Sequence, residues 1–468
     1  MGFVNGNLVV TPSAVPELSA VRVPFETAGP VLDAPAGGRV RVRGVQLDDL
    51  PAIWRFCAES YDVYRGCSFE DFRSVWHHRW LHNPAAAPGQ PLGWLLENDA
   101  SQVVGFYGVV PVRLRIGGRA VTAFSGSNWI VHPDYRRHKL KEGNGAESGS
   151  QALFREYMAL GAQNVLVSTG VAPAAATARE RVMKRIPVEG IDRSMWWIID
   201  PKRFLALKVA QLGAKSAIWK AVASAAPALN MLGPLWPIAL GIYTDPKHRI
   251  RPWLSPARIE FDCPELPVER VTSFRHEFDA FWAEHRESYD VTTERSSAFL
   301  RWRHCMLPES VGQSFVFACR DHGRLLGYVA LQTPGTRSDT VLRGSYTVTD
   351  LFYPPGREDV LGNLMNAAFR FVVEQNGTVL KASGFHPVVQ AALASQRPHV
   401  IEPDALQNLA RGRALRLLAA RSLRKGHNTA TEPKPKGSYW YKVPTRDLAE
   451  TCESGSWWPA AIDGTSTL

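Results

Sequence analysis

The pattern of apolar and polar positions occurs twice along the chain, in the same order. In the first half a tryptophan-containing helical segment ends at Pro84, and an apolar strand and then a strand through Gly105 follow. In the second half the same order of helix, strand and strand runs through Pro308 and Gly327. The prolines are 224 positions apart and the glycines 222, which indicates an approximate duplication.

A second set of elements follows at a similar offset. Strand patterns over residues 128–132 and 347–353 each lead through a loop into a helical pattern, at 151–160 and 361–374. Each helix is therefore the next predicted element after a central strand, and its N-terminus lies at the sheet. Such a helix start favours phosphate, because its free N–H groups and its dipole both face the anion.

Residues 109–116 show period-two apolar alternation, and Gly117-Gly118 supplies a tight turn after them. Each half thus reads helix, antiparallel strands, central strand, loop, helix, strand and helix. This order predicts an α+β fold of two tandem domains, each a mixed, mainly antiparallel sheet flanked by helices. We expect an N-terminal extension, a first domain, an interdomain helical linker, a second domain, and a basic C-terminal helix with a closing strand, at residues 1–39, 40–200, 201–264, 265–405 and 406–468.

One segment, residues 221–244, has no charged residue and is long enough to cross a bilayer. Three prolines and Asn230 interrupt it and would leave backbone groups unpaired in lipid. A buried or interdomain helical hairpin, an interfacial membrane contact and a membrane span are the alternatives. The helical spacing of apolar residues, with lysines opposite, favours an interdomain helical element for residues 203–243.

Composition is that of an ordinary globular protein: of 468 residues, 45% are hydrophobic and 21% charged. The net charge of +10 suits an anionic partner, whether a phosphorylated cofactor, nucleic acid or acidic lipid. The six cysteines form no CxxC pair and no Cys/His metal spacing, so we expect reduced thiols and no metal. Residues 1–6 show no secretory pattern, and we expect a cytoplasmic protein, with or without peripheral membrane contact.

The stretch Val131-His-Pro-Asp-Tyr-Arg-Arg137 resembles the GCN5-related N-acetyltransferase superfamily. In that superfamily a similar stretch ends the fourth strand and leads into the pyrophosphate loop for acyl-CoA. Gly327-Tyr328 and Thr349-Asp350-Leu351 resemble a degenerate second copy, and Trp457-Trp458 is similar to the C-terminal end of tandem members. The resemblance implies an acyltransferase of bacterial biosynthesis that uses acetyl-CoA or another acyl-CoA. Its acceptor would be a small molecule, saccharide or natural product bound between the domains.

The resemblance also assigns cofactor-binding residues in the first copy. Two strand residues would polarise the thioester carbonyl through main-chain N–H groups, three cations would contact the phosphates, and three loop residues would supply further donors. In that order they are Ile130 and Val131; Arg136, Arg137 and Lys139; and Gly143, Asn144 and Gly145. Lysines replace the superfamily's early loop glycines, so the loop is either displaced and still phosphate-binding, or has drifted. In the second copy Pro354 and Pro355 lack N–H groups, and we expect no CoA there.

Amine acetylation needs a base for the ammonium proton and an acid for the departing thiolate. His132 at the strand end suits either role, or is an ordinary surface histidine. Asp350 follows a β-branched run, where desolvation would raise its pKa and make it a general base, unless the loop backbone satisfies it. Glu180 lies where the superfamily places acceptor-side and thiolate-side groups, or forms a solvated ion pair. Tyr107 is a proton donor or a packing residue.

Two other classes of function are compatible with the sequence. One is a transferase whose acyl donor is an aminoacyl-tRNA or an acyl carrier protein, which the net charge tolerates and the missing early glycines favour. The other is a non-catalytic scaffold, membrane-associated through residues 203–243. Two basic-aromatic clusters, residues 76–80 and 301–304, either stack on ligands or belong to the core.

Overall fold

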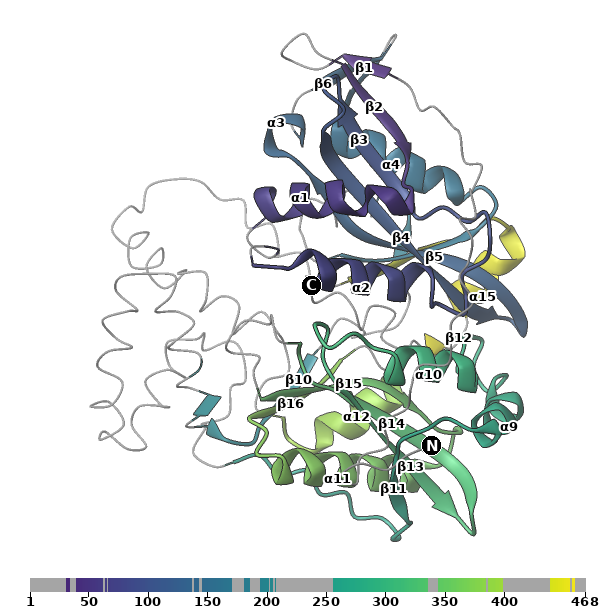
Figure 1. Ribbon diagram of the computed structural model, residues 1–468. Coiled ribbons are helices and arrows are strands. Elements are labelled where there is room, and N and C mark those ends of the chain that lie inside the picture. The colour runs from purple at the N-terminus through teal and green to yellow at the C-terminus, as the bar shows by residue number, and fades with distance from the viewer. Residues whose placement is uncertain are drawn as a thin grey trace, which may run out of the picture.

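The structure of the protein is a computed structural model (Figure 1). It describes residues 31–33, 39–61, 64, 66–136, 139–142, 145–170, 181–185, 194–201, 203–204, 207, 256–335, 344–383, 386–398, 438–454 and 457–458. The described elements form two β-sheets flanked by helices. The predicted α+β fold of two mixed sheets with helices around them is confirmed.

The first sheet is built mainly from the first half of the chain. Its strands are β1 Val31–Asp33, β2 Arg39–Gly44, β3 Gly93–Asn98, β4 Val103–Ile116, β5 Arg119–Val131, β6 Lys139–Glu142, β7 Gly145–Ser148, β8 Val165–Gly170, β9 Lys184–Arg185, β12 Val291–Thr293, β17 Ser438–Lys442 and β18 Trp457–Trp458. They run in the order β7-β6-β1-β2-β3-β4-β5-β8-β17-β9, with β12 on β4 and β18 on β12. Most pairs are antiparallel, whereas β5 and β8 are parallel.

Helices cover both faces of this sheet. They are α1 Leu50–Ser60, α2 Phe69–Trp80, α3 Pro133–Arg136 and α4 Gly149–Leu160, with a 3₁₀ turn at Leu47–Asp49 and α15 Arg446–Ser454 near the C-terminus. The α2 helix begins at Ser68, whose side chain accepts the Asp71 N–H, and its basic last turn matches the helix dipole. Phe106 of β4 packs with α1 and α2, and the next residue, Tyr107, packs with α4. Alternation along the strand therefore separates the two cores.

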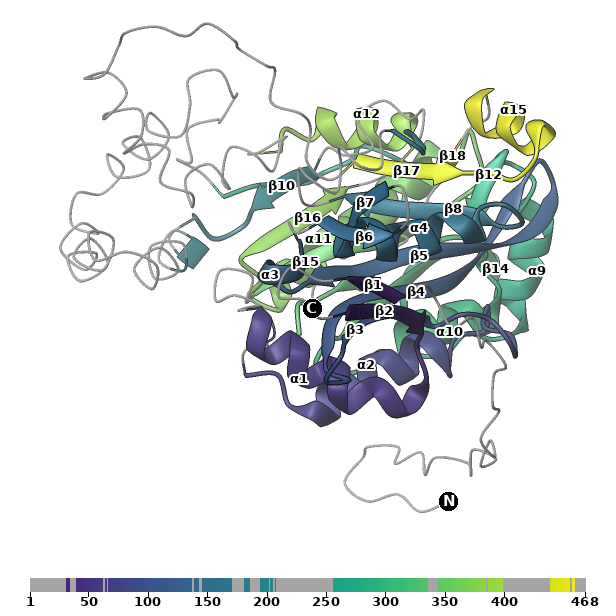
Figure 2. The same cartoon turned by 90° about the horizontal axis from the view of Figure 1, so that it is seen from above.

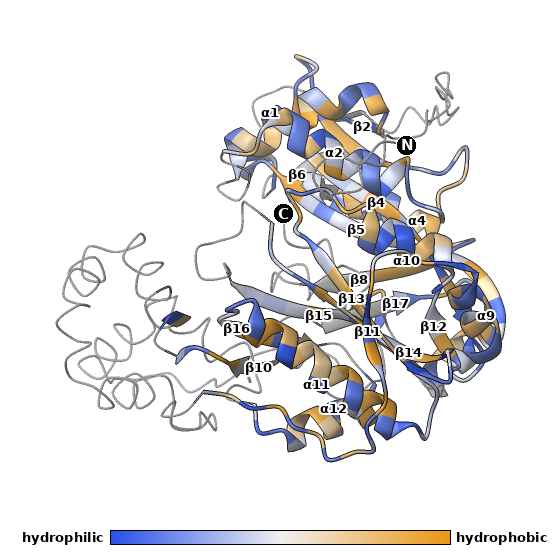
Figure 3. Ribbon diagram, turned by 60° about the horizontal axis from the view of Figure 1, so that its bottom comes forward, coloured by the Kyte–Doolittle hydropathy of each residue, from blue (hydrophilic) through white to orange (hydrophobic). Residues whose placement is uncertain are grey.

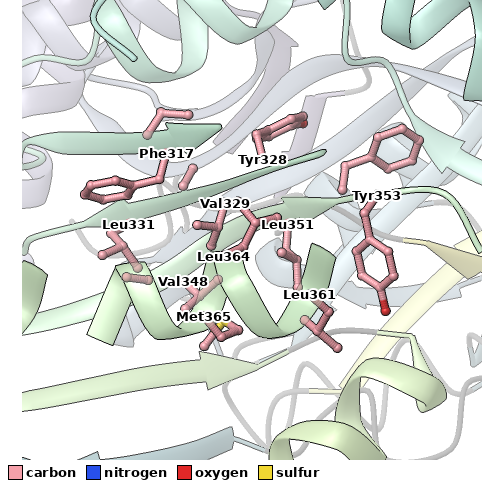
Figure 4. Close-up of a cluster of buried hydrophobic side chains, with 14 of the residues drawn as sticks. Phe317, Tyr328, Val329, Leu331, Val348, Leu351, Tyr353, Leu361, Leu364 and Met365 are labelled. Carbon is pink, nitrogen blue, oxygen red and sulfur yellow. The ribbon is translucent and has the colours of Figure 1, made fainter. Parts of the chain in front are cut away.

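The second sheet runs in the order β10-β16-β15-β14-β13-β11. Its elements are β10 Ser194–Ile198, β11 Val268–Val271, β13 Ser314–Asp321, β14 Arg324–Gln332, β15 Ser345–Phe352, β16 Val379–Ser383, α9 His276–His285, α10 Ser297–Cys305, α11 Glu358–Glu374 and α12 Pro387–Ser395. The apolar faces of α11 and α12 turn toward the sheet (Figure 3). Side chains of β14 and β15 pack on Leu361, Leu364 and Met365 of α11 (Figure 4).

The two halves exchange their last strands. Strand β10 follows the first half along the chain but pairs with β16 of the second sheet. Strand β17 follows the second half but pairs with β8 of the first sheet (Figure 2). Residues 194–198, predicted in the first domain, thus complete the second sheet, and the closing strand of the C-terminal segment completes the first.

The predicted duplication extends to the register of the strands. Parallel pairing of β5 with β8 ends at Gly126 opposite Ser168, and that of β15 with β16 ends at Val348 opposite Ala382. In each half the central strand then continues alone toward its end. Both central strands also carry a bulge just beyond this point.

Helices α2 and α10 occupy equivalent places and meet each other (Figure 1). The rings of His78 and Trp302 stack at 4.9 Å, and Trp302 Nε1 donates to the His78 carbonyl at 2.8 Å. These two residues are 224 positions apart, the offset of the duplication. Residues meet their own equivalents where they lie close to a two-fold axis, so this contact is consistent with an approximate two-fold axis passing between α2 and α10.

Two expectations concern segments outside the described residues. The element predicted over 203–243 is described only at Arg203, Phe204 and Leu207, and the basic segment from 406 to 437 is not described. In the described part of the chain no helix has the length and apolar character to span a bilayer.

Candidate functional site

The site candidate is the open edge of β5 in the first half. Its parallel pairing with β8 stops at Gly126, while β5 itself runs on to Val131. On its other edge the strand remains paired with β4 through Val131. The register shifts between Phe106 and Gly108 of β4, and Asn128 lies in the left-handed region at φ 55°. This bulge turns backbone groups of β5 away from the regular ladder.

The last paired positions differ chemically between the halves. In the first half they are Gly126 and Ser168, and in the second Val348 and Ala382. The Ser168 hydroxyl is buried and has no hydrogen-bond partner among the described residues. A buried hydroxyl without a partner is costly, and the second half has no side-chain hydroxyl at either of its last paired positions.

Packing on the α4 side explains the glycine at position 126. A Cβ there would overlap the Tyr107 hydroxyl. Tyr107 itself is fully buried, with its ring 4.9 Å from Tyr157 and 5.7 Å from Trp129. The predicted proton donor therefore lies inside an aromatic core beside the open edge.

On the α1 and α2 side, polar groups gather at the bulge. Asn128 Nδ2 donates to the Tyr64 hydroxyl at 2.5 Å, and Arg79 Nη1 donates to Ser127 Oγ at 3.4 Å. Arg79 is buried, with its guanidinium 4.9 Å from the Trp76 ring. Burial, more than any other cause, raises the pKa of Tyr64, so this hydroxyl keeps its proton at neutral pH.

The predicted cofactor residues Val131 and Arg136 lie at the end of β5 and in the α3 turn that follows it. The Val131 N–H donates to the Tyr61 hydroxyl at 3.0 Å, and that hydroxyl donates to the Val131 carbonyl at 2.7 Å. Arg136 Nη2 donates to the same hydroxyl at 2.9 Å. Ile130, the other predicted backbone donor, lies opposite Phe106 of β4. The two N–H groups proposed for a thioester thus lie on this strand, and that of Val131 is occupied by Tyr61.

The segment predicted to be a glycine-rich phosphate loop contains strands instead. Lys139 lies in β6 and Gly145 in β7, and the two strands pair antiparallel. Strand β6 also pairs with β1, antiparallel. Residues 139–142 read Lys-Leu-Lys-Glu and contain no glycine, so this stretch lacks the residue that a tight phosphate-binding loop uses most. Arg137, Gly143 and Asn144 lie outside the described residues.

Helix α4 begins directly after this hairpin. Ser148 caps it reciprocally with Gln151, and a Cβ on Gly149 would come 3.1 Å from the Tyr135 carbonyl. Trp129 Nε1 donates to the Ser150 carbonyl at 3.2 Å, which ties the bulge to the first turn. No acidic residue lies in this turn, whereas α11 of the second half begins with Glu358 and Asp359. The positive end of α4 is therefore the one suited to an anion.

His132, the predicted acid or base, follows β5 directly. Its main-chain N–H donates to the Val104 carbonyl at 2.8 Å, and its Nδ1 accepts the Asp134 N–H at 3.4 Å. Its side chain is 39% exposed. The histidine thus begins the α3 turn while its ring remains accessible from solvent. Glu180 lies outside the described residues.

Asp350 does not have the environment predicted for a general base. Its carboxylate is fully buried, 3.1 Å from Arg295 Nη2, and it accepts the Tyr328 hydroxyl at 2.8 Å and the Leu351 N–H at 2.9 Å. Burial alone would raise its pKa, but the charge of Arg295 and these donors hold the pKa below its ordinary value. The expected raised pKa is therefore wrong, because the sequence argument included burial but not the arginine 55 positions earlier.

The structure thus groups Tyr107, Ile130, Val131, His132 and Arg136 around one strand, and places Asp350 in the other sheet. Sequence reasoning missed Tyr61, Tyr64 and Arg79. The signal available for the arginine was its place in the basic-aromatic helix, 224 positions before Arg303, which donates to the Thr349 carbonyl at 3.5 Å. No signal in the sequence singled out the two tyrosines of the short α1–α2 connection.

No family model and no curated protein matches this chain. Among solved structures it is similar to Saccharomyces cerevisiae N-myristoyltransferase with bound myristoyl-CoA, at 10% identity over 89% of this chain and 84% of that one, with a TM-score of 0.44. A GCN5-related N-acetyltransferase from Anabaena variabilis is similar at 13% identity, over 88% and 74% of the two chains, with a TM-score of 0.41.

A probable N-acyltransferase of unknown function from Enterococcus faecalis is similar at 11% identity, over 74% of this chain, with a TM-score of 0.41. The match spans 66% of that protein, just under two thirds of its length. These are similarities of overall fold, and they specify no residue of the site.

Proposed function

We propose that this protein is an acyltransferase that takes an acyl group from acyl-CoA at the open edge of β5. The observation that carries the proposal is the end of the β5–β8 pairing at Gly126 and Ser168, five residues before β5 itself ends. The pantetheine arm of CoA contains two amides, and an open strand edge can pair with amides as it would with another strand.

The first half fits such a ligand at three points. The Ser168 hydroxyl lacks a partner among the described residues at the last paired position. The bulge at Asn128 frees backbone groups from the ladder. The N-terminus of α4 and the exposed Arg136 supply positive charge for phosphates.

The second half does not fit it. Val348 and Ala382 are apolar at the equivalent position, and the carboxylate of Asp350 with Arg295 fills the bulge. Glu358 and Asp359 at the start of α11 would repel a pyrophosphate. We therefore assign donor binding to the first half alone.

Bound acyl-CoA would supply an activated acyl thioester, and the residues around the bulge would orient it. The protonated Tyr64 hydroxyl and the accessible His132 ring are the groups available to hold or exchange protons. Acetyl is the proposed acyl group, and a small molecule, saccharide or natural product bound between the halves is the proposed acceptor.

A second candidate is a transferase that takes its acyl group from an acyl carrier protein or aminoacyl-tRNA. The hairpin of β6 and β7 favours it, because these strands stand where a loop of main-chain donors for the pyrophosphate was expected. Acetyl-CoA, free CoA, tRNA, acyl carrier protein and anionic liposomes would therefore be compared in one thermal-shift series. The first proposal expects stabilisation by acetyl-CoA and CoA, and stabilisation by tRNA or carrier protein alone would favour the second.

Two arginines, one after the central strand of each half, provide the matched variants. Arg136→Ala removes a charge-assisted contact and should weaken acetyl-CoA binding about tenfold. Arg357→Ala, before α11 and paired with Asp359 at 2.7 Å, should leave binding unchanged. Equal binding by wild type and Arg136→Ala would place the phosphates elsewhere.

A further inference from the structure

Tyr61 lies where the chain leaves α1, and its hydroxyl reaches the last residue of β5. This single oxygen takes part in three hydrogen bonds: it accepts the Val131 N–H at 3.0 Å, accepts from Arg136 Nη2 at 2.9 Å and donates to the Val131 carbonyl at 2.7 Å. The Arg136 guanidinium also lies 6.0 Å from the Tyr61 ring. One side chain thus occupies both main-chain groups with which Val131 would pair with another strand.

The neighbouring tyrosine in the same connection behaves differently. The Tyr64 hydroxyl bonds to the Asn128 side-chain amide, not to the backbone of β5. Tyr64 therefore leaves the main chain of the open edge available, whereas Tyr61 does not. The two residues form a natural comparison within one short segment.

We propose that the Tyr61 contact, defined as the bonds from its hydroxyl to Val131 and Arg136, closes the end of the acyl-donor site and must open when the donor binds. The inference rests on the proposed function. An acceptor of the donor arm and the Tyr61 hydroxyl compete for the single N–H of Val131. The Val131 carbonyl already accepts from both Tyr61 and Arg136, at 2.7 and 3.1 Å, so an amide N–H of the donor arm would have to displace one of them.

Arg136 links opening to the recognition of phosphate. Its Nη2 is shared between the Tyr61 hydroxyl and the Val131 carbonyl, at 2.9 and 3.1 Å. A phosphate bound by Arg136 withdraws this donor from Tyr61, since charge-assisted bonds to phosphate are stronger than bonds to a neutral hydroxyl. Binding of the donor's phosphates at Arg136 therefore weakens the Tyr61 contact. That contact covers Val131, beside which the acyl end of the donor would lie.

The test is the sign of the effect of Tyr61→Phe on acetyl-CoA affinity, measured by calorimetry on the full chain. Removal of the competing hydroxyl should tighten binding about two- to tenfold, since each lost bond is a modest net contribution. Tyr64→Phe, which spares the Val131 backbone, should not tighten it. Unchanged or weaker binding by Tyr61→Phe would overturn the proposal.

A second measurement detects the Tyr61 contact in the protein without any ligand. Amide hydrogen exchange at Val131 should be faster in Tyr61→Phe than in wild type, and unchanged in Tyr64→Phe. Equal exchange in wild type and Tyr61→Phe would overturn the proposal. If Tyr61→Phe fails to fold, Tyr61→Leu takes its place in both measurements with the same expected outcomes.

Failure of the proposed function has a different signature. In that case neither wild type nor the Tyr61 variants bind acetyl-CoA. If the inference alone is wrong, wild type binds acetyl-CoA and the variants bind it no more tightly.

Discussion

The bulges of the two central strands occupy equivalent places but carry different side chains, one uncharged and one charged. In the first half the bulge carries Asn128, an uncharged and partly exposed residue bonded to Tyr64. In the second half, 222 positions later, it carries Asp350, fully buried and paired with Arg295. The same backbone irregularity thus carries a neutral hydrogen-bonded pair in one copy and a buried ion pair in the other.

The second-half bulge belongs to the interior of its domain. The Asp350 carboxylate has partners on both oxygens, from Arg295, Tyr328 and its own strand. A buried charge pair of this kind is expensive to break, although not necessarily favourable to have. The second half thus has a buried ion pair at its bulge, whereas the first half has hydrogen-bonded neutral side chains there.

The largest expected effect is a difference in folding stability between variants at these two positions. Asp350→Ala leaves the Arg295 charge buried without its counterion and should lower the free energy of unfolding by about 3–5 kcal/mol. Asn128→Ala removes one hydrogen bond and puts alanine into the left-handed region at φ 55°, so it should cost about 2 kcal/mol. Urea denaturation of both variants measures the difference.

A double variant controls for the charge. Asp350→Leu with Arg295→Met replaces the pair by apolar side chains and should recover much of the loss. Equal losses for Asp350→Ala and Asn128→Ala would show that the pair is not the structural feature inferred here.

The next largest effect is a loss of folding stability at acidic pH, to which one histidine in each half contributes. Burial, followed by neighbouring arginine charges, lowers the pKa of His78 and of His304 to about 3. Unfolded histidine has a pKa of about 6.5, so the unfolded chain binds these protons first as the pH falls. Stability is then full above pH 6.5 and is lost between pH 6.5 and 3, by about 2 kcal/mol for each histidine at pH 5.

Unfolding free energies measured from pH 7.5 to 4.5 test this dependence. His304→Gln should remove about half of the decline that the two histidines cause, because one of the two titrating groups is gone. A decline identical to that of wild type would mean that His304 titrates normally in the folded protein.

A smaller effect concerns the last paired positions. Ala382→Ser introduces into the second half the buried hydroxyl that the first half has, and should cost about 1–3 kcal/mol for its desolvation. Ser168→Ala removes a hydroxyl that lacks a partner among the described residues and should be neutral or stabilising. Thermal unfolding of the two variants checks this, and a loss on Ser168→Ala would reveal a bond to that hydroxyl.

Much of the fold could be predicted from the sequence because it depends on local signals. Pro84 and Pro308 follow the ends of equivalent helices, Gly105 and Gly327 lie in equivalent strands, and their offsets revealed the duplication. The exchange of β10 and β17 could not be predicted, because an apolar strand of five residues suits the edge of either sheet equally well.

The site was predicted only in part, for a similar reason. Val131 and Arg136 were found because they lie in one continuous stretch. The hydroxyl that occupies Val131 comes from Tyr61, 70 positions earlier, and the counterion of Asp350 from 55 positions earlier. Contacts between residues far apart in the sequence are not visible in the local pattern. Such contacts determine which groups surround Val131 and Asp350.

The most direct test of the account is amide hydrogen exchange of the wild-type protein with and without acetyl-CoA. We predict new protection over residues 127–131 of β5 and the first turn of α4, with one equivalent bound per chain. Residues 349–352 of β15 and the first turn of α11 should exchange as before, because Asp350, Arg295 and the acids of α11 leave no donor site there. Protection over β15 and α11, or equally over both halves, would contradict the assignment of the donor site to the first half.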